Sequence, residues 1–419
     1  MRSVAMMWKT KGTKKMTNIA VLGYGIVGSG IVEILTKNRA DIDMRSGDSI
    51  NVKYILDIRA FPGDANAHKI TDDFEKIIND PEINIICEAI GGLSPAYDFS
   101  KRALLMGKSV ITSNKELVAA HGAELLRLAR ENKCSYLFEA AVGGGIPIIR
   151  PLVSSLTAEN IERIMGILNG TTNYILSKME KDGATYTESL AQAQQLGYAE
   201  SDPKADVEGD DTCRKLAILA SQMTGRRVKY ENIPTEGITR ISAADFDYAK
   251  ALGMTIKLLA MAELDENGQL GAIVAPFLLD SSQPLYNVSD VYNAILVLSD
   301  NLEYSMYYGR GAGKLPTASA IISDVVDCVR SGGQSTLCFW DDTDMDIAPP
   351  GRTQRRFFVR MANSEANSRA TATLFPGHRP LAVINADEYA FLVEPMSEAA
   401  FEDSVAKLPD GIISRIRIV

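Results

Sequence analysis

The chain has 419 residues, 46% of them hydrophobic and 23% charged, which is enough for two or three globular domains with separate cores. Its formal net charge of −9 argues against nucleic acid or a membrane surface as a partner, because either would require clustered lysine and arginine. Five cysteines without CxxC spacing, together with only three histidines, predict reduced core thiols, a cytoplasmic protein and no tightly bound transition metal.

The first 15 residues carry five basic side chains and no acidic one, and their apolar run at residues 4–8 is too short for a signal-peptide core. We expect this stretch to be a disordered extension, with Met16 as an alternative start. Nowhere does the sequence contain an uncharged apolar run of the length that spans a bilayer.

A dinucleotide-binding turn is predicted next. The apolar strand 19–22 runs into Gly-Tyr-Gly-Ile-Val-Gly, and apolar residues at 31, 34 and 35 continue as a helix. Glycines between a strand and a helix allow a tight turn and close approach of a pyrophosphate, whose charge the helix N-terminus stabilises. The predicted cofactor contacts in this turn are Gly23, Gly25, Ile26, Val27 and Gly28.

The second predicted strand, 51–56, ends at Asp57, and Arg59 follows at once. An acidic residue at this position binds the ribose of NAD, whereas an arginine accommodates the extra phosphate of NADP. The two residues therefore favour different cofactors, and the sequence leaves NAD and NADP open.

Three further apolar runs, 83–90, 109–112 and 136–142, each end in small or polar residues. Ligands of open α/β sheets bind at the carboxyl ends of the strands, so these ends are expected to face a site. Together with the glycine turn they predict a Rossmann-type dinucleotide-binding domain over residues 17–150, completed by residues 311–330.

Beyond residue 151 the pattern predicts an α+β domain. Strand 161–168 leads to small polar residues at 169–173 that suit the N-cap of a helix. Paired runs at 256–264 with 269–279, and at 293–298 with 302–308, flank turn residues and predict a mixed or antiparallel sheet. We assign residues 151–310 to a catalytic and dimerisation domain, after which glycines at 309–313 and a helix over 318–329 return the chain to the cofactor.

The stretch 193–215 is rich in carboxylates and ends in a helix that places Asp211 and Lys215 four residues apart on one face. A lysine held beside a carboxylate can transfer a proton. The same spacing also describes an ordinary solvated ion pair, so the pair alone does not decide between the two.

The whole string is more specific than the pair. Its order of residues resembles that of homoserine dehydrogenases, and so do two other segments of the chain. The resemblance covers residues 17–330 and rests on Gly197-Tyr198-Ala199, Asp202-Pro203, Asp206-Val207, Gly209, Asp211 and Lys215, on Thr112-Ser113-Asn114-Lys115, and on GILNGTTNYIL at 166–176.

This resemblance implies NAD(P)-dependent interconversion of L-aspartate 4-semialdehyde and L-homoserine, a step toward threonine, methionine and isoleucine, by a homodimer or homotetramer. It implies catalytic roles for Lys215 in proton transfer, for Asp211 in orienting it, and for Lys115 beside nicotinamide and substrate. The remaining residues that it implies bind substrate (Glu200, Asp211, Gly197), cofactor (Ser113, Lys115, Gly313) and a monovalent cation, Na⁺ or K⁺ (Glu139, Val142, Gly144, Ile146).

The end of the chain resembles the family less. Residues 331–355 have the composition of a linker, and residues 356–419 predict a small α+β module with strands at 356–361, 381–385, 389–393 and 413–418 and a helix at 398–407. The module resembles an ACT-like regulatory domain, but residues 362–379 lack its apolar helix pattern. We therefore expect an assembly role, with weak or absent sensitivity to threonine.

Two alternatives stay open at this level. One is another Rossmann-fold dehydrogenase that acts on an amino acid or semialdehyde. The other is a non-catalytic nucleotide or amino-acid sensor, which is disfavoured because a sensor would be free to lose Lys115, Asp211 and Lys215.

Overall fold

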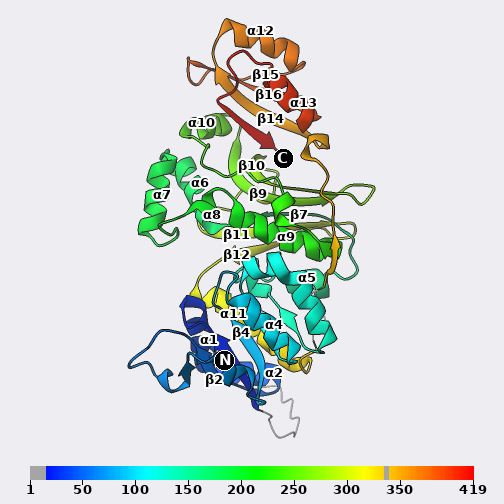
Figure 1. Ribbon diagram of the computed structural model, residues 1–419. Coiled ribbons are helices and arrows are strands. Elements are labelled where there is room, and N and C mark those ends of the chain that lie inside the picture. Colours follow the sequence, from blue (N-terminus) through cyan, green and yellow to red (C-terminus); the bar gives the residue numbers. More distant parts are fainter. Residues whose placement is uncertain (1–15, 335–338) are drawn as a thin grey trace, which may run out of the picture.

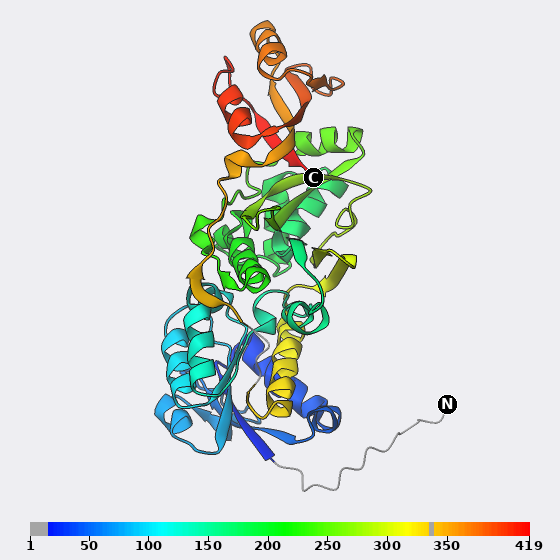
Figure 2. The ribbon, with the colours of Figure 1, turned by 90° about the vertical axis from the view of Figure 1, so that its right-hand side faces the viewer.

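The computed structural model describes residues 16–334 and 339–419, which form three tiers stacked along the molecule (Figure 1). A parallel sheet with flanking helices makes the lower tier, a larger sheet with helices the middle, and a small α+β module the top. The side view shows the same order, with the C-terminal strand at the junction of the upper two tiers (Figure 2). The predicted N-terminal extension and Cys338 lie outside the described residues.

The lower tier is a six-stranded parallel sheet of order β3-β2-β1-β4-β5-β6, the doubly wound arrangement that binds dinucleotides where the strand order reverses. Its strands are apolar runs that are largely buried in the centre of the sheet, as parallel sheets require, and only partly buried toward one edge. They are β1 (Met16–Leu22), β2 (Ser49–Leu56), β3 (Ile70–Thr71), β4 (Ile83–Glu88), β5 (Ser109–Thr112) and β6 (Tyr136–Leu137), with helices α1 (Ile26–Lys37), α2 (Arg39–Ser46), α3 (Phe74–Ile78), α4 (Ala96–Leu105) and α5 (Lys115–Glu131).

Helix α11 (Lys314–Arg330) returns from the middle tier and packs against α1 (Figure 1). A Cβ at Gly30 would lie 2.9 Å from the carbonyl oxygen of Lys314, so the two helices approach more closely than a side chain permits. The helix begins earlier than the predicted start at 318 because Pro316 falls within its first turn, where a missing N–H costs nothing.

The predicted strand 136–142 is wrong beyond Leu137. The chain turns there into a short 3₁₀ helix, Glu139–Ala141. The carboxylate of Glu139 folds back to accept hydrogen bonds from the backbone N–H groups of Ile148 (2.5 Å), Ile149 (2.8 Å) and Arg150 (2.8 Å). An acidic side chain that caps a following helix in this way ends the strand.

The middle tier is built on antiparallel strands, as predicted. The runs at 256–264 and 269–279 form one hairpin, and those at 293–298 and 302–308 form the second. The elements are strands β7 (Ile161–Ile167), β9 (Met254–Leu264), β10 (Leu270–Asp280), β11 (Tyr292–Ser299) and β12 (Glu303–Arg310), and helices α6 (Gly170–Asp182), α7 (Tyr186–Gln195), α8 (Lys204–Val207), α9 (Asp210–Thr224) and α10 (Ala243–Ala251).

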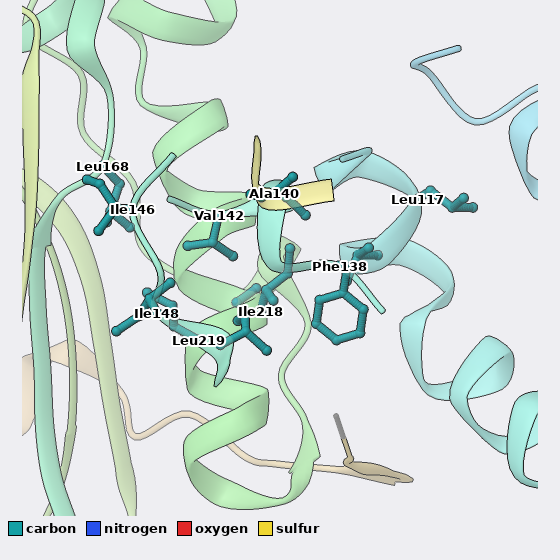
Figure 3. Close-up of a cluster of buried hydrophobic side chains, with 14 of the residues drawn as sticks. Leu117, Phe138, Ala140, Val142, Ile146, Ile148, Leu168, Ile218 and Leu219 are labelled. Carbon is teal, nitrogen blue, oxygen red and sulfur yellow. The ribbon is translucent and has the colours of Figure 1, made fainter. Parts of the chain in front are cut away.

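Helix α9 joins the two lower tiers. Ile218 and Leu219 on its apolar side lie among Phe138, Val142 and Ile148 from the segment that leaves the parallel sheet (Figure 3). All five side chains are buried. Burial of each such side chain contributes about 1.5–3 kcal/mol, so the middle of this helix is held firmly against the lower tier.

The top tier has the order of a ferredoxin-like βαββαβ module, and its strand order is β17-β14-β16-β15. Its last strand pairs in parallel with β10, so the upper two tiers share one nine-stranded sheet. The elements are β14 (Gln354–Ala362), α12 (Glu365–Leu374), β15 (Arg379–Pro380), β16 (Glu388–Ser397), α13 (Glu398–Val405) and β17 (Ser414–Ile418).

Two expectations for this module are wrong. A helix, α12, forms in the polar stretch where the apolar pattern is missing, because Ser364 caps it and its buried side includes the hydrogen-bonded Asn367 and Thr371. The predicted strand 381–385 does not form; the strand is displaced to 379–380, and Val383 and Ile384 are exposed.

Within the stretch predicted as a linker, residues 339–355 include a short strand and a helical turn. Strand β13 (Asp341–Asp344) pairs with β8 (Arg226–Arg227), and the buried Trp340 packs edge-on against Phe138. The segment therefore runs along the outside of α9 toward the top tier (Figure 2). Short helical turns complete the chain at Ala67–Lys69, Pro151–Ser155, Tyr230–Asn232 and Pro350–Arg352.

Within residues 16–334 and 339–419, no helix is long and apolar enough to cross a membrane. The same residues contain no group of three or more histidine, cysteine or acidic side chains placed to hold a metal ion. The four cysteines in this part of the chain are buried and free, as predicted for reduced core thiols: Cys87, Cys134, Cys213 and Cys328.

Candidate active site

A cavity of about 400 Å³ lies where the lower and middle tiers meet. It is lined by the ends of several elements that are far apart in the sequence. Apolar and polar surface both contribute, as is usual for a site that takes a small polar substrate. The lining residues are Lys115, Asn169, Gly170, Thr171, Leu196, Gly197, Tyr198, Asp206, Asp211, Lys215, Val291, Arg310, Gly311, Ala312 and Gly313.

Two lysines share one carboxylate in this cavity. Lys115 Nζ lies 2.6 Å from one oxygen of Asp211, and Lys215 Nζ lies 2.7 Å from the other. Lys215 also donates to the backbone carbonyl of Leu168, at 2.8 Å. The structure thus brings together all three residues predicted to be catalytic, from two different tiers.

The charges of this cluster depend on one another. Asp211 is only 3% exposed, and burial works against its ionised form, but the two lysines outweigh burial and hold its pKa well below the ordinary value. Burial likewise works against the Lys115 ammonium, and the Asp211 carboxylate outweighs it, so the pKa of Lys115 is raised. Each charge is therefore held in the cavity by its partners.

Asp206 is a second carboxylate of the cavity that the sequence pattern included without a role. The amide of Asn169 donates to both Asp206 (2.7 Å) and Asp211 (2.9 Å). Burial raises the pKa of Asp206, and hydrogen bonding from Asn169 only partly opposes this. Asn169 itself was recognised only as a helix cap; its position just before Gly-Thr-Thr-Asn was the available signal.

Three helices begin at the cavity. Asn114 caps α5 by accepting from Leu117 N (3.1 Å), and Asn169 caps α6 by accepting from Thr172 N (2.9 Å). Helix α9 follows Gly209, whose φ of 89° is the left-handed conformation that glycine adopts readily. Backbone N–H groups and helix dipoles that converge in this way favour an anionic group of a ligand.

The predicted dinucleotide turn has the required shape. Gly23 has φ of 93°, and a Cβ there would lie 2.8 Å from the carbonyl oxygen of Ala89. A Cβ at Gly28 would lie 1.8 Å from the carbonyl oxygen of Gly23, whereas one at Gly25 would meet only the guanidinium of Arg59 at 4.0 Å. The outer two glycines are thus needed for packing, and the middle one leaves room for a pyrophosphate.

Asp57 and Arg59, which favoured different cofactors, form one unit. The carboxylate accepts from Tyr24 N (2.8 Å) and from the Arg59 side chain (2.9 and 2.8 Å). These bonds from Arg59 are the main cause of the lowered pKa of Asp57. The guanidinium is more than half exposed, so it is available to a phosphate beside the glycine turn.

The other predicted contacts differ in placement. Gly313 lines the cavity, and Ser113 and the exposed Ile26 lie at the same carboxyl edge of the sheet. Gly197 lines the cavity too, but Glu200 lies outside its lining, exposed on the loop between α7 and α8. Among residues 16–334 and 339–419 its carboxylate has no hydrogen-bond or ion-pair partner, so the side chain can turn toward a substrate.

The predicted cation ligands lie in the turn that joins the lower and middle tiers. The Glu139 carboxylate is already occupied by backbone N–H groups, as described above. In the part of the chain that the structure describes, the carbonyl oxygens of Val142, Gly144 and Ile146 accept no hydrogen bond outside regular elements. The available donors for a cation are therefore main-chain oxygens, which suit a monovalent ion better than a transition metal.

Comparison with known proteins agrees with this geometry. A model of the homoserine dehydrogenase family matches residues 147–326, and a model of the NAD-binding domain of homoserine dehydrogenase matches residues 23–139. The homoserine dehydrogenase of Synechocystis sp. is 46% identical over 318 residues, which cover 74% of this chain and 73% of that enzyme.

Solved structures extend the likeness to nearly the whole chain. A homoserine dehydrogenase from Thiobacillus denitrificans superposes with a TM-score of 0.88 at 34% identity, covering 97% of this chain and 99% of that one. A hyperthermophilic archaeal homoserine dehydrogenase in complex with NADPH superposes with a TM-score of 0.63 at 30% identity, covering 74% of this chain and 97% of that one.

Proposed function

This chain belongs to the homoserine dehydrogenase family, and from that premise we propose how its own residues carry out the NAD(P)-dependent reaction. The observation that carries the proposal is the cluster of Lys115, Asp211 and Lys215, in which one buried carboxylate holds two ammonium groups at a cavity. A nicotinamide cofactor at the glycine turn supplies or accepts the hydride.

Lys215 is the proton donor to the aldehyde oxygen of aspartate semialdehyde in the direction of reduction, and the acceptor of the hydroxyl proton of homoserine in oxidation. The Leu168 carbonyl and Asp211 fix its ammonium at 2.8 and 2.7 Å, so its position does not depend on the substrate. Lys115, on the other oxygen of Asp211, adds positive charge where an alkoxide develops.

Substrate binding is assigned to the carboxylates and helix ends of the cavity. Asp206 binds the substrate ammonium, because an added cation offsets the burial that raises its pKa. Glu200 and Gly197 close over the amino acid from the loop between α7 and α8. The substrate carboxylate lies toward the converging N-termini of α5 and α6.

The cofactor assignment rests on the turn after β1. Gly25 leaves space for the pyrophosphate, and Asp57 with Arg59 forms the ribose end. We propose that the exposed guanidinium of Arg59 binds the 2′-phosphate of NADP. The phosphate would compete with the Asp57 carboxylate for this guanidinium. A related enzyme in complex with NADPH is consistent with this assignment.

A monovalent cation, Na⁺ or K⁺, is proposed at the turn of Val142, Gly144 and Ile146, through carbonyl oxygens. Glu139 contributes its main chain, since its carboxylate caps Ile148. The role would be structural: the ion would hold this turn against Gly311, whose carbonyl lies 2.2 Å from a Cβ placed on Gly144. Activity measured with and without added Na⁺ or K⁺ tests it.

We further propose a homodimer formed through the edge strand β12. Tyr304, Met306 and Tyr308 on this strand are all exposed, and its outer edge carries no paired strand among the described residues. Exposed aromatic and apolar side chains on an unpaired edge favour a second copy of the sheet. A Met306→Lys variant that stays dimeric in sedimentation would contradict this surface.

We also propose a role for each domain of the chain. Residues 17–150 with 311–330 bind the cofactor, residues 151–310 hold the substrate and the dimer contact, and the ACT-like residues 356–419 serve assembly. We place the enzyme in the cytoplasm, in keeping with its reduced cysteines.

A substrate panel tests the proposal. Purified enzyme is assayed for nicotinamide absorbance with L-homoserine, lactate, malate and aspartate, each with NAD and NADP. Homoserine is expected to be the substrate that supports turnover. Equal turnover with malate would favour a broader dehydrogenase, and binding of cofactor without turnover of any substrate would favour a sensor.

A further inference from the structure

A buried carboxyl group lies at the carboxyl end of β4, outside the lysine cluster. Glu88 is 0% exposed, and one of its oxygens accepts from Ile90 N (2.7 Å) and Gly91 N (3.4 Å). The other oxygen shares a hydrogen bond of 2.5 Å with the hydroxyl of Thr112 at the end of β5. Glu88 therefore ties the loop after one strand to the end of the next.

The network continues to the start of α5. The Thr112 oxygen accepts from Asn114 N (2.9 Å), and the Asn114 amide donates to the carbonyl of Gly92 (2.6 Å). The loop 89–92 and the segment 112–115 are thus joined at two points. Lys115, the first residue of α5, follows this network directly.

The loop that Glu88 holds also contacts the dinucleotide turn. Ala89 N donates to the Leu22 carbonyl at the end of β1, and Gly23 lies against the Ala89 carbonyl. These residues occupy the point where the strand order of the sheet reverses, which is where open α/β sheets bind a dinucleotide. Glu88 lies between the cofactor turn and Lys115.

Burying a carboxyl group at this position costs free energy. No cation pairs with Glu88 among residues 16–334 and 339–419, and burial raises its pKa despite the hydrogen bonds from Thr112 and two backbone groups. An apolar residue would fill the end of a buried strand at lower cost. A fully hydrogen-bonded buried network instead fixes one geometry of the loops that it joins.

We propose that Glu88 and Thr112 are a buried positioning pair that holds the cofactor-side loop 89–92 at a fixed distance from Lys115. The inference rests on the catalytic role proposed for Lys115. Loss of the pair lets the two loops separate, so that hydride and proton transfer no longer occur in one fixed geometry. Neither residue contacts the substrate; both act through the loops.

The test compares two substitutions of one residue. Thr112→Val keeps the shape and removes the hydroxyl, and we expect kcat to fall by about 10-fold or more, because small misplacements of reacting groups are costly. The primary deuterium isotope effect on kcat, measured with homoserine deuterated at its hydroxyl-bearing carbon, should rise as hydride transfer becomes rate-limiting. Thr112→Ser restores the hydroxyl and should return both values to within about two-fold of wild type.

Ser109→Ala is the matched control. This residue is buried at the other end of β5, and its hydroxyl accepts from Ser135 N at 3.1 Å. It should lower thermal stability as Thr112→Val does, with kcat and the isotope effect unchanged. Glu88→Gln, which keeps the shape and loses the charge, provides a second route if Thr112→Val does not fold.

Combining Thr112→Val with Lys115→Ala separates a failure of the role proposed for Lys115 from a failure of the inference about Glu88 and Thr112. If Lys115→Ala alone keeps wild-type activity, the role proposed for Lys115 fails. If Lys115→Ala is slow, and adding Thr112→Val slows it by the same factor as in the otherwise wild-type enzyme, Glu88 and Thr112 do not act through Lys115 and the inference is overturned. Wild-type kcat and isotope effect in both Thr112→Val and Glu88→Gln would overturn it as well.

Discussion

Asp211→Asn is the substitution that most sharply probes the electrostatics of the lysine cluster. It keeps the shape of the side chain and removes the one charge that Lys115 and Lys215 share, at 2.6 and 2.7 Å. The two ammonium groups then remain close together in a cavity without their common counter-charge. Both the stability of their charged forms and their orientation should suffer.

The size of the effect follows from the distances. At an effective dielectric constant of about 20, two unit charges 2.7 Å apart interact by roughly 6 kcal/mol, which is an upper bound. In proteins, an opposite charge this close changes a pKa by about 1 to 3 pH units. Lys115 has a side chain that is 42% exposed, so solvent screening weakens its interaction with Asp211.

The assay is the pH dependence of homoserine oxidation. Lys115 must stay charged to stabilise the developing alkoxide, so the rate falls as pH rises through the pKa of Lys115. Because Asp211 raises the pKa of Lys115, its loss should move this falling limb to lower pH. The maximal kcat should fall by about 10²-fold, since the lysines also lose their orientation.

Asp210→Asn is the matched control, because Asp210 is the exposed neighbour in the same turn of α9. It should leave the maximal rate and the position of the limb unchanged. A profile of Asp211→Asn whose limb coincides with that of wild type would refute the reasoning, because it would mean that the carboxylate does not raise the pKa of Lys115.

Three other substitutions test separate parts of the account. Arg59→Ala should raise the KM for NADP by about 10-fold or more and leave that for NAD little changed, since only NADP loses a charge-assisted contact; equal weakening would place Arg59 elsewhere. Glu200→Ala should mainly raise the KM for homoserine, and an unchanged KM removes this residue from the substrate site. Arg417→Met leaves the buried Glu398, which Arg417 binds at 2.7 Å, without this partner, so the unfolding free energy should drop by about 3 kcal/mol in urea denaturation; no change would mean that Arg355 alone compensates.

The sequence predicted the parts of this fold that depend on local pattern. The glycine turn, the buried parallel strands and the two hairpins follow from apolar runs and turn residues, and the structure confirms them. The predictions that were wrong concern polar side chains whose hydrogen bonds do not show in a pattern of apolar residues. Glu139 caps Ile148 nine residues further on, and Asn367 and Thr371 stabilise the polar α12 through bonds to main-chain oxygens five and four residues away.

The same distinction holds in the site. The spacing of Asp211 and Lys215 predicted their common helix face, because both lie on one element. The pairing of Asp211 with Lys115 is a contact between α9 and α5, and only the family resemblance suggested that Lys115 belonged there. Asp206 was visible in the motif but had no role until Asn169 was seen to join it to Asp211.

The most direct measurement is the steady-state rate of NAD(P) reduction by L-homoserine for wild type and Lys215→Ala, with thermal unfolding of both. We expect turnover by the wild type, and for Lys215→Ala a kcat that is lower by about 10²-fold or more, the usual scale for a lost proton-transfer group, in a protein that is still folded. Lys215→Ala with near wild-type turnover would contradict the central claim that this lysine transfers the proton.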